Sequence, residues 1–471
     1  MSAWFGVALF PMVAAIMLAT GLPAYLVLIG AAGAGALFVV ATGGDAALLT
    51  ALGARLQALL EGDLLQALPL FVMMGVTMNR LPLVTSLFRA GARLGGASAG
   101  AARLSALAIG ALVAPMNGSV GASVSMLSRG VAPLLAKEGA APAERIALIA
   151  AASTLGVAIP PSLVLLFLGD AMLNAHTIAA RATNASARIV NTQDIFRAAL
   201  VPAAATLALW AIVAVARSRR AKASDAERPP LSPREALLAT LVTASIFVLM
   251  GGVAGGFFYA VEAAATGCVA ALAAGACTRA LTFAALKGIL RDTLAISGAL
   301  FALLAAATTF TLVLRVLGAD RLANDLLAAA PGGPAAAVAA ALAIMAASAL
   351  VLDAFEIVFV IVPVVMPGAL MRAPDAAWVA ALTVMTLQAS FLAPPLGYAM
   401  MMTRAAADEA AATAQIAREV APYLAALVAV IAVAIAWPGM THLLDPPASS
   451  VVAPAERLDI APPEPPPPFR Q

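Results

Sequence analysis

Charged residues are scarce in this chain of 471 residues. Asp, Glu, Lys and Arg together make up 11% of it, whereas hydrophobic residues make up 63%. The mean hydropathy is +0.99. Soluble globular proteins carry about 25% charged residues, so this composition excludes a soluble domain. The formal net charge of +3 is small and is spread through connecting segments, which argues against nucleic-acid binding.

Cysteine and histidine are nearly absent. Cys268 and Cys277 both lie in apolar sequence, which excludes a disulfide framework, a zinc site and a redox motif. His176 and His442 have no metal-ligating partner at a suitable spacing. The sequence also contains no nucleophile–base arrangement, phosphate-binding loop or cofactor motif. We therefore predict that the protein is not an enzyme and that it carries no cofactor.

Long apolar runs are abundant. Stretches near 20 residues recur along almost the whole length, which predicts an all-α membrane protein with many spans. The first of them has no basic segment before it, and we expect it to be a retained helix and not a cleaved signal. The predicted helices are two in 3–41, a short interfacial one at 47–62, and others near 64–80, 98–114, 143–158, 162–180, 195–216, 235–250, 253–277, 294–317, 334–350, 375–392 and 420–437.

The most basic connector of the chain divides it. Residues 217–233 read RSRRAKASDAERPPLSP, and the positive-inside rule predicts that they are cytoplasmic. They separate a first half, residues 1–216, from a second half, residues 234–440. The remaining tail, residues 441–471, is rich in proline, and we expect it to be disordered.

The two halves share a register. Pro160 and Pro161 lie 234 residues before Pro394 and Pro395. The same offset matches Ser119 with Asp353, and Thr154 with Gln388. Chance alignment of apolar sequence is the alternative explanation. Paired interruptions at corresponding positions are typical of transporters built from inverted repeats.

The double prolines interrupt runs that are long enough to cross a bilayer. A helix broken at mid-membrane frees carbonyl groups that can coordinate a cation and amide groups that can hold an anion. Hard cations such as sodium prefer oxygen ligands. A tolerated proline kink is the alternative at each site. The side chains that flank the breaks and can add oxygen ligands are Ser153, Thr154, Ser162, Gln388 and Ser390.

A small, polar segment precedes the first break. Its sequence, Asn117-Gly118-Ser119-Val120-Gly121-Ala122-Ser123, favours a chain reversal inside the membrane, because glycine lets backbone approach a ligand closely. We therefore predict the tip of a re-entrant hairpin there. The alternative is a small-residue surface for helix packing.

Carboxylates lie within apolar runs of the second half. Asp353 and Glu356 stand one helical turn apart, and such groups must face the protein interior or an aqueous path. We expect Asp353 to bind a cation or to cap a second hairpin tip, with Glu356 on the same face. A structural hydrogen bond or a membrane-edge pair is the alternative. Glu262 and Asp170 are further candidates for buried acids.

These stretches together resemble a known family. The sequences LPLFVMMGV, NGSVGASVSMLSRGVAPLL, AASTLGVAIPPSLVLLFLGD, LDAFEIVFVIVPVVMP and LQASFLAPPLGYAM are similar to the large membrane subunit, of DctM type, of tripartite ATP-independent periplasmic (TRAP) transporters. The resemblance covers about residues 1–440. It is nearest to the subgroup labelled mannitol/chloroaromatic or 2-oxoacid.

The resemblance implies a function and a fold. It implies sodium-coupled uptake of an organic acid across the bacterial inner membrane by an elevator-type fold with inverted repeats, two re-entrant hairpins and two broken helices. The implied partners are a small membrane subunit of DctQ type, not fused to this chain, and a periplasmic binding protein of DctP type. Membrane lipid surrounds the complex, and the solute itself is not identified by the sequence.

The resemblance also assigns site residues. It implies that the first hairpin tip runs from Asn117 to Ser123 and the first break from Ser153 to Ser162, including Gly156. The second hairpin contains Asp353, and the second break runs from Gln388 to Gly397. Ala393 replaces the Thr or His that is usual in the family before the second double proline. The functional alternatives are a stand-alone sodium/carboxylate symporter of related fold and a membrane scaffold without transport activity.

Overall fold

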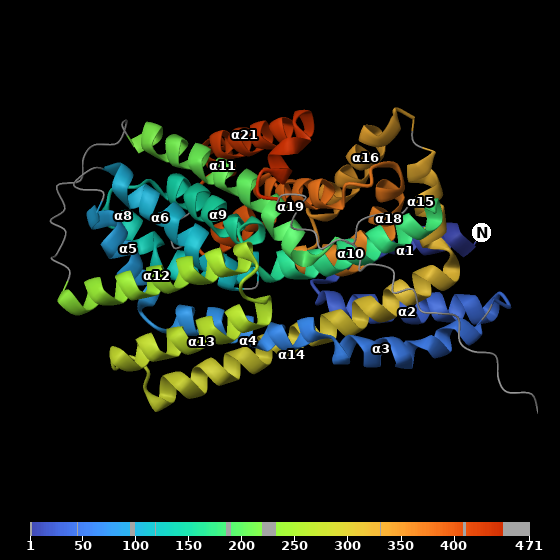
Figure 1. Cartoon of the computed structure of the whole chain (residues 1–471), viewed down its shortest axis with the longest axis horizontal. Coiled ribbons are helices and arrows are strands. Elements are labelled where there is room, and N and C mark those ends of the chain that lie inside the picture. The colour runs from blue at the N-terminus through green and yellow to red at the C-terminus, as the bar shows by residue number, and fades with distance from the viewer. Residues whose placement is uncertain are drawn as a thin grey trace, which may run out of the picture.

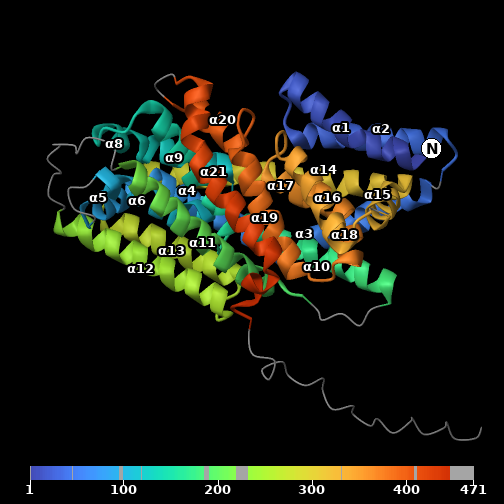
Figure 2. The same cartoon turned by 90° about the horizontal axis from the view of Figure 1, so that it is seen from above.

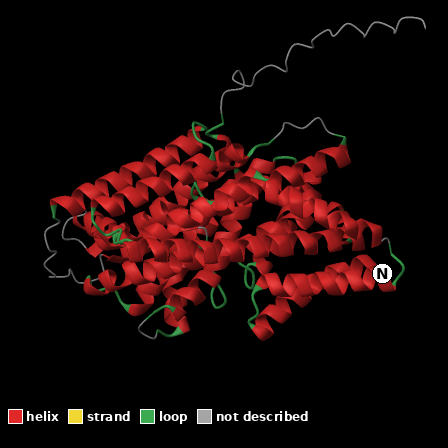
Figure 3. Cartoon of the chain, turned by 90° about the horizontal axis from the view of Figure 1, so that it is seen from below, coloured by secondary structure: helices red, strands yellow, loops and turns green. Residues whose placement is uncertain are grey.

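The computed structural model describes residues 2–44, 46–94, 99–117, 119–184, 190–218, 232–329, 331–407 and 411–445. Every regular element in these ranges is a helix (Figure 3). Nine of the helices are long and apolar enough to cross a membrane, or ten if the bent pair Leu49–Glu61 and Leu65–Arg80 forms one span. The predicted all-helical, multi-span fold is confirmed. Gly118, most of the basic connector and nearly all of the proline-rich tail lie outside the described residues.

The helices follow one another with short connections. The element bounds, in chain order, are α1 (Ser2–Thr20), α2 (Ala24–Ala41), η1 (Ala46–Ala51), α3 (Leu52–Glu61), α4 (Asp63–Arg80), α5 (Leu83–Leu94), α6 (Ala99–Val113), η2 (Ala114–Asn117), α7 (Val120–Gly130), α8 (Ala132–Lys137), α9 (Pro142–Ala158), α10 (Leu163–Thr183), α11 (Thr192–Ser218), α12 (Pro233–Gly255), α13 (Ala260–Cys277), α14 (Phe283–Leu317), α15 (Ala319–Ala328), α16 (Gly333–Ser348), α17 (Ala354–Glu356), the π-helical turn η3 (Ile357–Ile361), α18 (Val362–Arg372), α19 (Ala376–Leu392), α20 (Tyr398–Ala405), α21 (Thr413–Ala436) and η4 (Pro438–His442).

The helices fall into two groups in space. We use "inner group" for α6–α11 with α16–α21, and "outer layer" for α1–α4 with α12–α14. In Figure 1 most of the outer layer lies along the lower side of the molecule, and the long helix α14 runs beside α2 and α4. The inner group is centred on α9 and α19, which contact each other and also contact α11 and α21. Figure 2 shows α19 and α21 crossing the middle of the molecule.

Charged pairs fix one end of the inner group. Arg217, at the end of α11, pairs with Glu419 near the start of α21. Arg103 in α6 pairs with Glu144 in the first turn of α9. The phenol of Tyr423 lies within electrostatic range of all four charged groups. The starts of α6, α9 and α21 therefore lie at the same end as the basic connector, which follows α11 directly.

The opposite end of α21 lies beside α19. The indole Nε1 of Trp378, in the first turn of α19, donates a hydrogen bond of 2.8 Å to the carbonyl of Ala434. Asp375, which caps α19, lies 2.8 Å from Nε2 of His442, after the end of α21. Helix α19 therefore begins beside the C-terminal end of α21, whereas α9 begins beside the N-terminal end of α21. The two helices that lead into the double prolines enter the protein from opposite ends, as inverted repeats require.

The same contacts define two hairpins. Since α6 and α9 begin at one end, α7 and α8 must return the chain from η2 to the end where α6 started. In the second half, α16 and α18 pack against each other, and α18 leads directly to the start of α19 at the other end. Each hairpin therefore reverses inside the protein, and the two reversals approach the centre from opposite ends.

Several helices differ from their predicted bounds. Helix α14 begins at Phe283 and not near 294, because Lys287, Arg291 and Asp292 lower the hydropathy of its first turns without breaking the helix. The amphipathic helix α5 was not predicted, since Arg89 and Arg93 interrupt its apolar run. The short helices α8, α15 and α20 were not predicted either, because none of them is long enough to give a span-like signal.

We expect Arg103→Met to destabilise the protein by about 3 kcal/mol, because breaking a buried ion pair leaves the partner charge without compensation. Arg103 is 1% exposed, so water cannot replace the lost contact with Glu144. Thermal unfolding in detergent, followed by size-exclusion chromatography, measures the loss. The double variant Arg103→Met with Glu144→Leu should recover much of it. A single variant as stable as the wild type would contradict this account.

His442 predicts a pH-dependent term in stability. Partial burial alone would lower the pKa of its imidazole, but the hydrogen bonds and charges of Asp375 and Asp445 outweigh that effect and raise the pKa above its ordinary value of 6.5. The stabilisation is therefore complete below about pH 6.5 and is lost as the pH rises through the higher folded-state pKa.

The measurement is the apparent Tm across that pH range for the wild type and for His442→Gln. The difference between the two should be largest at acidic pH and should shrink towards alkaline pH. A constant difference across the range would show that protonation of His442 does not contribute.

Candidate functional site

The first hairpin tip is held by amide and hydroxyl groups. Asn117 is buried, and its Nδ2 donates to Oγ of Ser123 at 3.3 Å. Nδ2 of Asn79, at the end of α4, donates to Oδ1 of Asn117 at 3.2 Å. Oγ of Ser123 also lies 3.2 Å from the carbonyl of Ala114. The described residues on either side of Gly118 are therefore linked by polar contacts, and Asn117 contacts the outer layer.

Equivalent residues cap the returning arm of each hairpin. Oγ of Ser119 accepts a hydrogen bond of 3.1 Å from the amide of Ala122, at the start of α7. Asp353 caps α17 through Oδ1, which accepts from the amide of Ala354 at 2.7 Å, and Glu356 accepts from the amide of Asp353 at 2.9 Å. The two carboxylates thus form a capping box. Only their remaining oxygen lone pairs are free for a ligand.

The double prolines separate helices at both predicted breaks. Pro160-Pro161 lies between α9 and α10, and Pro394-Pro395 lies between α19 and α20; both peptide bonds are cis. Ser162 caps α10, since its Oγ accepts from the amide of Leu165. In the first break both prolines are buried, whereas in the second Pro395 is exposed.

Thr154 and Gln388 meet between the two breaks. These residues occupy equivalent positions in the register of 234, and both are 0% exposed. Nε2 of Gln388 lies 3.5 Å from Oγ1 of Thr154, whose own proton is donated to the carbonyl of Ala151 at 2.8 Å. Among the described residues, Oε1 of Gln388 has no hydrogen-bond donor. A buried oxygen is thus left available at the point where the halves touch.

Close backbone approaches hold the first tip against the first broken helix. A Cβ atom at Gly156 would lie 2.6 Å from the carbonyl oxygen of Ala114, which is closer than real Cβ atoms come. Gly75 in α4 approaches the tip from the other side, where a Cβ would lie 2.5 Å from the carbonyl oxygen of Met116. Any side chain at either position would push the tip away.

Tyr398 connects the first tip with the second. Its hydroxyl lies 3.0 Å from the position that a Cβ of Gly121 would occupy. Its phenol also lies within electrostatic range of Asp353 and Glu356. Tyr398 begins α20, directly after the second break and Gly397. The two hairpin tips and the second break therefore converge on this one side chain.

Other predicted residues are engaged within their own segments. The hydroxyl of Ser153 donates to the carbonyl of Ala150 at 2.8 Å, and that of Ser390 donates to Thr386 at 2.9 Å. The amide of Gly397 donates to the carbonyl of Ala393 at 2.7 Å, which closes the turn after the second double proline. The lone pairs of the Ser153 and Ser390 hydroxyls and of the Ala393 carbonyl can still coordinate an ion.

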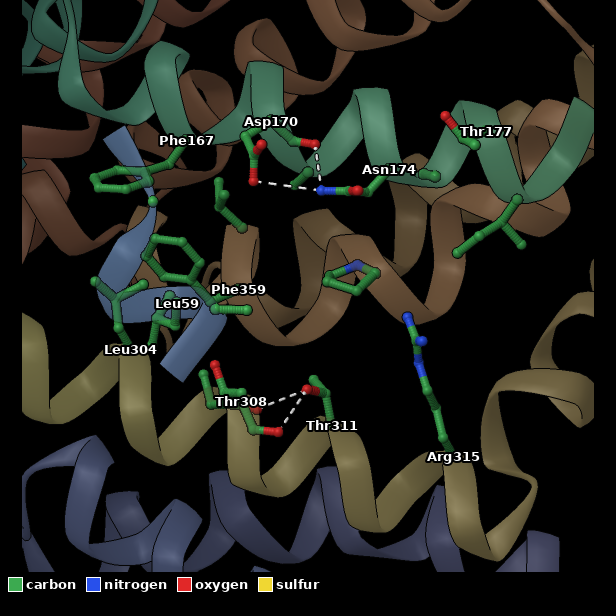
Figure 4. Close-up of a pocket in the computed structure, with 18 of the residues that line it drawn as sticks. Leu59, Phe167, Asp170, Asn174, Thr177, Leu304, Thr308, Thr311, Arg315 and Phe359 are labelled. Atoms are coloured by element: carbon green, nitrogen blue, oxygen red, sulfur yellow. Dashed lines mark hydrogen bonds between the residues drawn. The ribbon is translucent and has the colours of Figure 1, made fainter. Parts of the chain in front are cut away.

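A cavity of about 770 Å³ lies between the inner group and the outer layer (Figure 4). This volume falls within the range of small-molecule sites. Helices α10 and α14 form two of its walls, the residues around η3 form a third, and α3 contributes the fourth. Its polar lining residues are Asp170, Asn174, Thr177, Arg181, Thr308, Thr311 and Arg315.

The arginine residues of the cavity wall lie at the end of the molecule opposite the basic connector. Arg181 lies near the end of α10, and the chain then enters α11, which crosses back to the connector. Arg315 lies near the end of α14; this helix begins at the connector end because α12 and α13 form an antiparallel pair before it. Both arginines are exposed and stand at the same end of the cavity, which we call its mouth, whereas Phe167 and Leu304 are buried. Arg55 in α3, outside the cavity lining, lies within electrostatic range of both Arg315 and Asp320, so a third cation and one carboxylate stand near this end.

The sequence analysis did not assign Thr308, Thr311 and Arg315 to a site. These residues lie on successive turns of one face of an otherwise apolar helix, and this polar stripe is the signal that could have identified them. Asp170 was a candidate buried acid, and it is half-buried in the cavity wall.

The prediction that Glu262 is buried is wrong. Glu262 is exposed, and it accepts a hydrogen bond of 3.0 Å from the amide of Tyr259 at the start of α13. The local capping requirement of a helix start, and not a binding role, explains a carboxylate at that point of an apolar run. Among the described residues, no three His, Cys, Asp or Glu side chains gather as a metal site.

Two hairpins that reverse near two interrupted helices, beside a cavity with one cationic mouth, define a membrane transport protein. The family profile "Tripartite ATP-independent periplasmic transporter, DctM component" matches residues 11–440, and the chain belongs to this family. The protein is therefore a multi-pass transport protein of the bacterial inner membrane and not an enzyme. The predicted family is confirmed, while the predicted subgroup stays a prediction.

The chain is also similar to two further proteins. The uncharacterized protein YgiK of Salmonella typhimurium is 28% identical over 320 residues, which cover 66% of this chain and 68% of YgiK. The crystal structure of the YdaH transporter of Alcanivorax borkumensis, described as having an unusual topology, matches with a TM-score of 0.63 at 15% identity. That match covers 85% of this chain and 90% of YdaH, and it shows a shared fold.

We expect Gly156→Val to reduce uptake by about tenfold or more. The valine side chain would collide with the carbonyl of Ala114 and displace the backbone that leads into the first tip. Uptake is measured in cells, with the membrane abundance of each variant as the normalisation. Gly298→Ala in α14 is the matched control, since nothing lies within 4 Å of a Cβ there. Normal uptake by Gly156→Val would separate this contact from function.

Proposed function

We propose that this DctM component couples the entry of sodium to the uptake of an organic acid. A periplasmic binding protein of DctP type delivers the acid, and a small membrane subunit of DctQ type completes the complex. The observation that carries the proposal is the contact between Thr154 and Gln388, with the undonated buried oxygen of Gln388 beside it.

The donor set between the breaks suits sodium. The available groups are oxygens: Oε1 of Gln388, the lone pairs of Thr154, and the carbonyl groups that end α9 and α19. Hard cations bind such oxygens, whereas softer metals prefer sulfur and imidazole. The carbonyl ends of two helices also present the negative end of a helix dipole. The carboxyl groups of Asp353 and Glu356 add further oxygen donors at the neighbouring tip.

The cavity suits an anionic solute. Arg315, Arg181 and Arg55 gather at its mouth, and a guanidinium group binds a carboxylate through two parallel hydrogen bonds. The positive-inside rule assigns the basic connector to the cytoplasm, so the mouth at the opposite end would face the periplasm. An acid released by the binding protein would therefore meet cations first.

The chain divides into halves for this purpose. In our proposal residues 1–216 and 234–440 are the two repeat halves, joined by a cytoplasmic connector at 217–233. The inner group would carry the ion and the solute, while the outer layer would stay fixed in the membrane. The cavity lies between these two groups, where such a movement would change its access.

We expect reconstituted complex to take up the acid only with an inward sodium gradient and with the binding protein present. Radiolabelled uptake into proteoliposomes measures both requirements. Equal uptake in sodium-free buffer would overturn the coupling. Equal uptake without the binding protein would favour the stand-alone symporter.

We expect Gln388→Leu to raise the half-saturating sodium concentration for uptake by about tenfold, since losing one ligand of ~1.4 kcal/mol has that effect. Thr383→Val is the matched control, because Thr383 is also fully buried in α19 but donates its hydroxyl to Val379 of its own helix. Asp353→Asn should also impair transport while the complex still assembles. Wild-type sodium dependence in Gln388→Leu would remove this residue from the site.

A further inference from the structure

The cavity is graded from apolar to cationic along its length. Helices α10 and α14 both run towards its mouth, so residues earlier in each helix lie deeper. Figure 4 shows Phe167, Phe359, Leu59 and Leu304 together at one end, and Arg315 with Thr177 at the other. From Leu304 to Arg315 the helix rises by about 16 Å, at ~1.5 Å per residue. A solute in this cavity meets two different chemical environments.

The deep end is an aromatic pocket. The rings of Phe167 and Phe359 lie 4.9 Å apart in an edge-to-face arrangement, and Phe355 packs behind them with its centroid 6.1 Å from that of Phe167. Phe355 is buried, whereas Phe359 is partly open to the cavity. Such an end gains free energy by burying an apolar group and offers nothing to a charged one.

Asp170 stands one turn above Phe167, between the two ends. Its carboxylate is half-buried, and Nδ2 of Asn174 lies 3.4 Å from Oδ2 and 3.0 Å from the carbonyl of Asp170. No cation pairs with this carboxylate among the ion pairs that the described residues form. A second carboxylate on the solute, directed inward from Arg315, would therefore be repelled by Asp170.

We propose that the solute is a monocarboxylate with an apolar body, aromatic or branched, and that dicarboxylates are rejected. The carboxylate would bind at Arg315 and the apolar body would enter the pocket of Phe167, Phe359, Leu59 and Leu304. Asp170 is then a specificity-determining residue that acts by repulsion. This inference rests on the proposed function, since it assigns a solute class to the same cavity.

The test is a thermal-shift titration of the purified complex of this chain with its small subunit, at constant sodium. The probes are phenylacetate, the hydrophilic monocarboxylate gluconate and the dicarboxylate adipate. We expect phenylacetate to bind most tightly and adipate most weakly. Tighter binding of gluconate or adipate would overturn the inference, and so would the absence of a shift with all three.

Variants assign the ends of the cavity. Phe359→Ala should weaken the binding of phenylacetate by about tenfold (~1.4 kcal/mol) and leave the binding of gluconate unchanged. Leu59→Ala gives a second reading if Phe359→Ala fails to fold. Asp170→Asn should strengthen the binding of adipate and not that of the other two probes. Arg315→Gln should weaken the binding of all three probes. Arg129→Gln is the control, because Arg129 lies on α7 outside the cavity lining and bonds the carbonyl of Ser125. Adipate binding that Asp170→Asn leaves unchanged would overturn the role of Asp170.

The two proposals fail in different ways. If uptake depends on sodium but adipate is preferred, the solute class is wrong and the coupling stands. If phenylacetate binds as expected but uptake ignores sodium, the solute class stands and the coupling is wrong.

Discussion

The hydrogen-bonding requirement of the backbone in hydrocarbon is the constraint on which this structure depends. A lipid-facing peptide group has no water to bond, so an interrupted helix is stable only where protein surrounds it. The first double proline is buried, and the helices that lead into both breaks, α9 and α19, are enclosed by contacts with α11, α21 and each other, whereas Pro395 of the second break is exposed. The surrounding helices thereby shield a small volume from lipid. In this volume, backbone carbonyl and amide groups that form no helical hydrogen bond can bind a ligand.

Helix α21 contacts both α9 and α19 and fixes their opposite orientations. One end is tied to α11 by Arg217 and Glu419, and the other is tied to α19 by Trp378 and His442. These contacts place the starts of α9 and α19 at opposite ends, so that Thr154 and Gln388 meet although 234 residues separate them. Ser119 and Asp353, with the same separation, each cap the returning arm of a hairpin. The register seen in the sequence is thus matched by equivalent local geometry.

The cavity depends on the contact between two helices from different parts of the chain. Polar residues of α10 and α14 face each other there because both helices place one polar side chain on each successive turn of the shared face. The inner group supplies Asp170, Thr177 and the aromatic residues, and the outer layer supplies Arg315, Thr308 and Thr311. A relative movement of the two groups would therefore change the solute site directly, while the oxygens between the breaks belong to the inner group alone.

The sequence by itself determined the membrane class, the positions of the breaks and most of the helices, because hydropathy, proline chemistry and small-residue turns are local properties. It also gave Thr154 and Gln388 equivalent positions in the repeat, whereas their contact was decided by the tertiary structure. It missed α5, α8, α15 and α20, where length or charge hides the apolar signal, and it misjudged Glu262, which caps a helix. Only the tertiary structure decided that Tyr398 joins the two tips and that Arg315 shares a cavity with Asp170. Those relations depend on how helices distant in sequence pack, and no periodicity within a single helix encodes its neighbour.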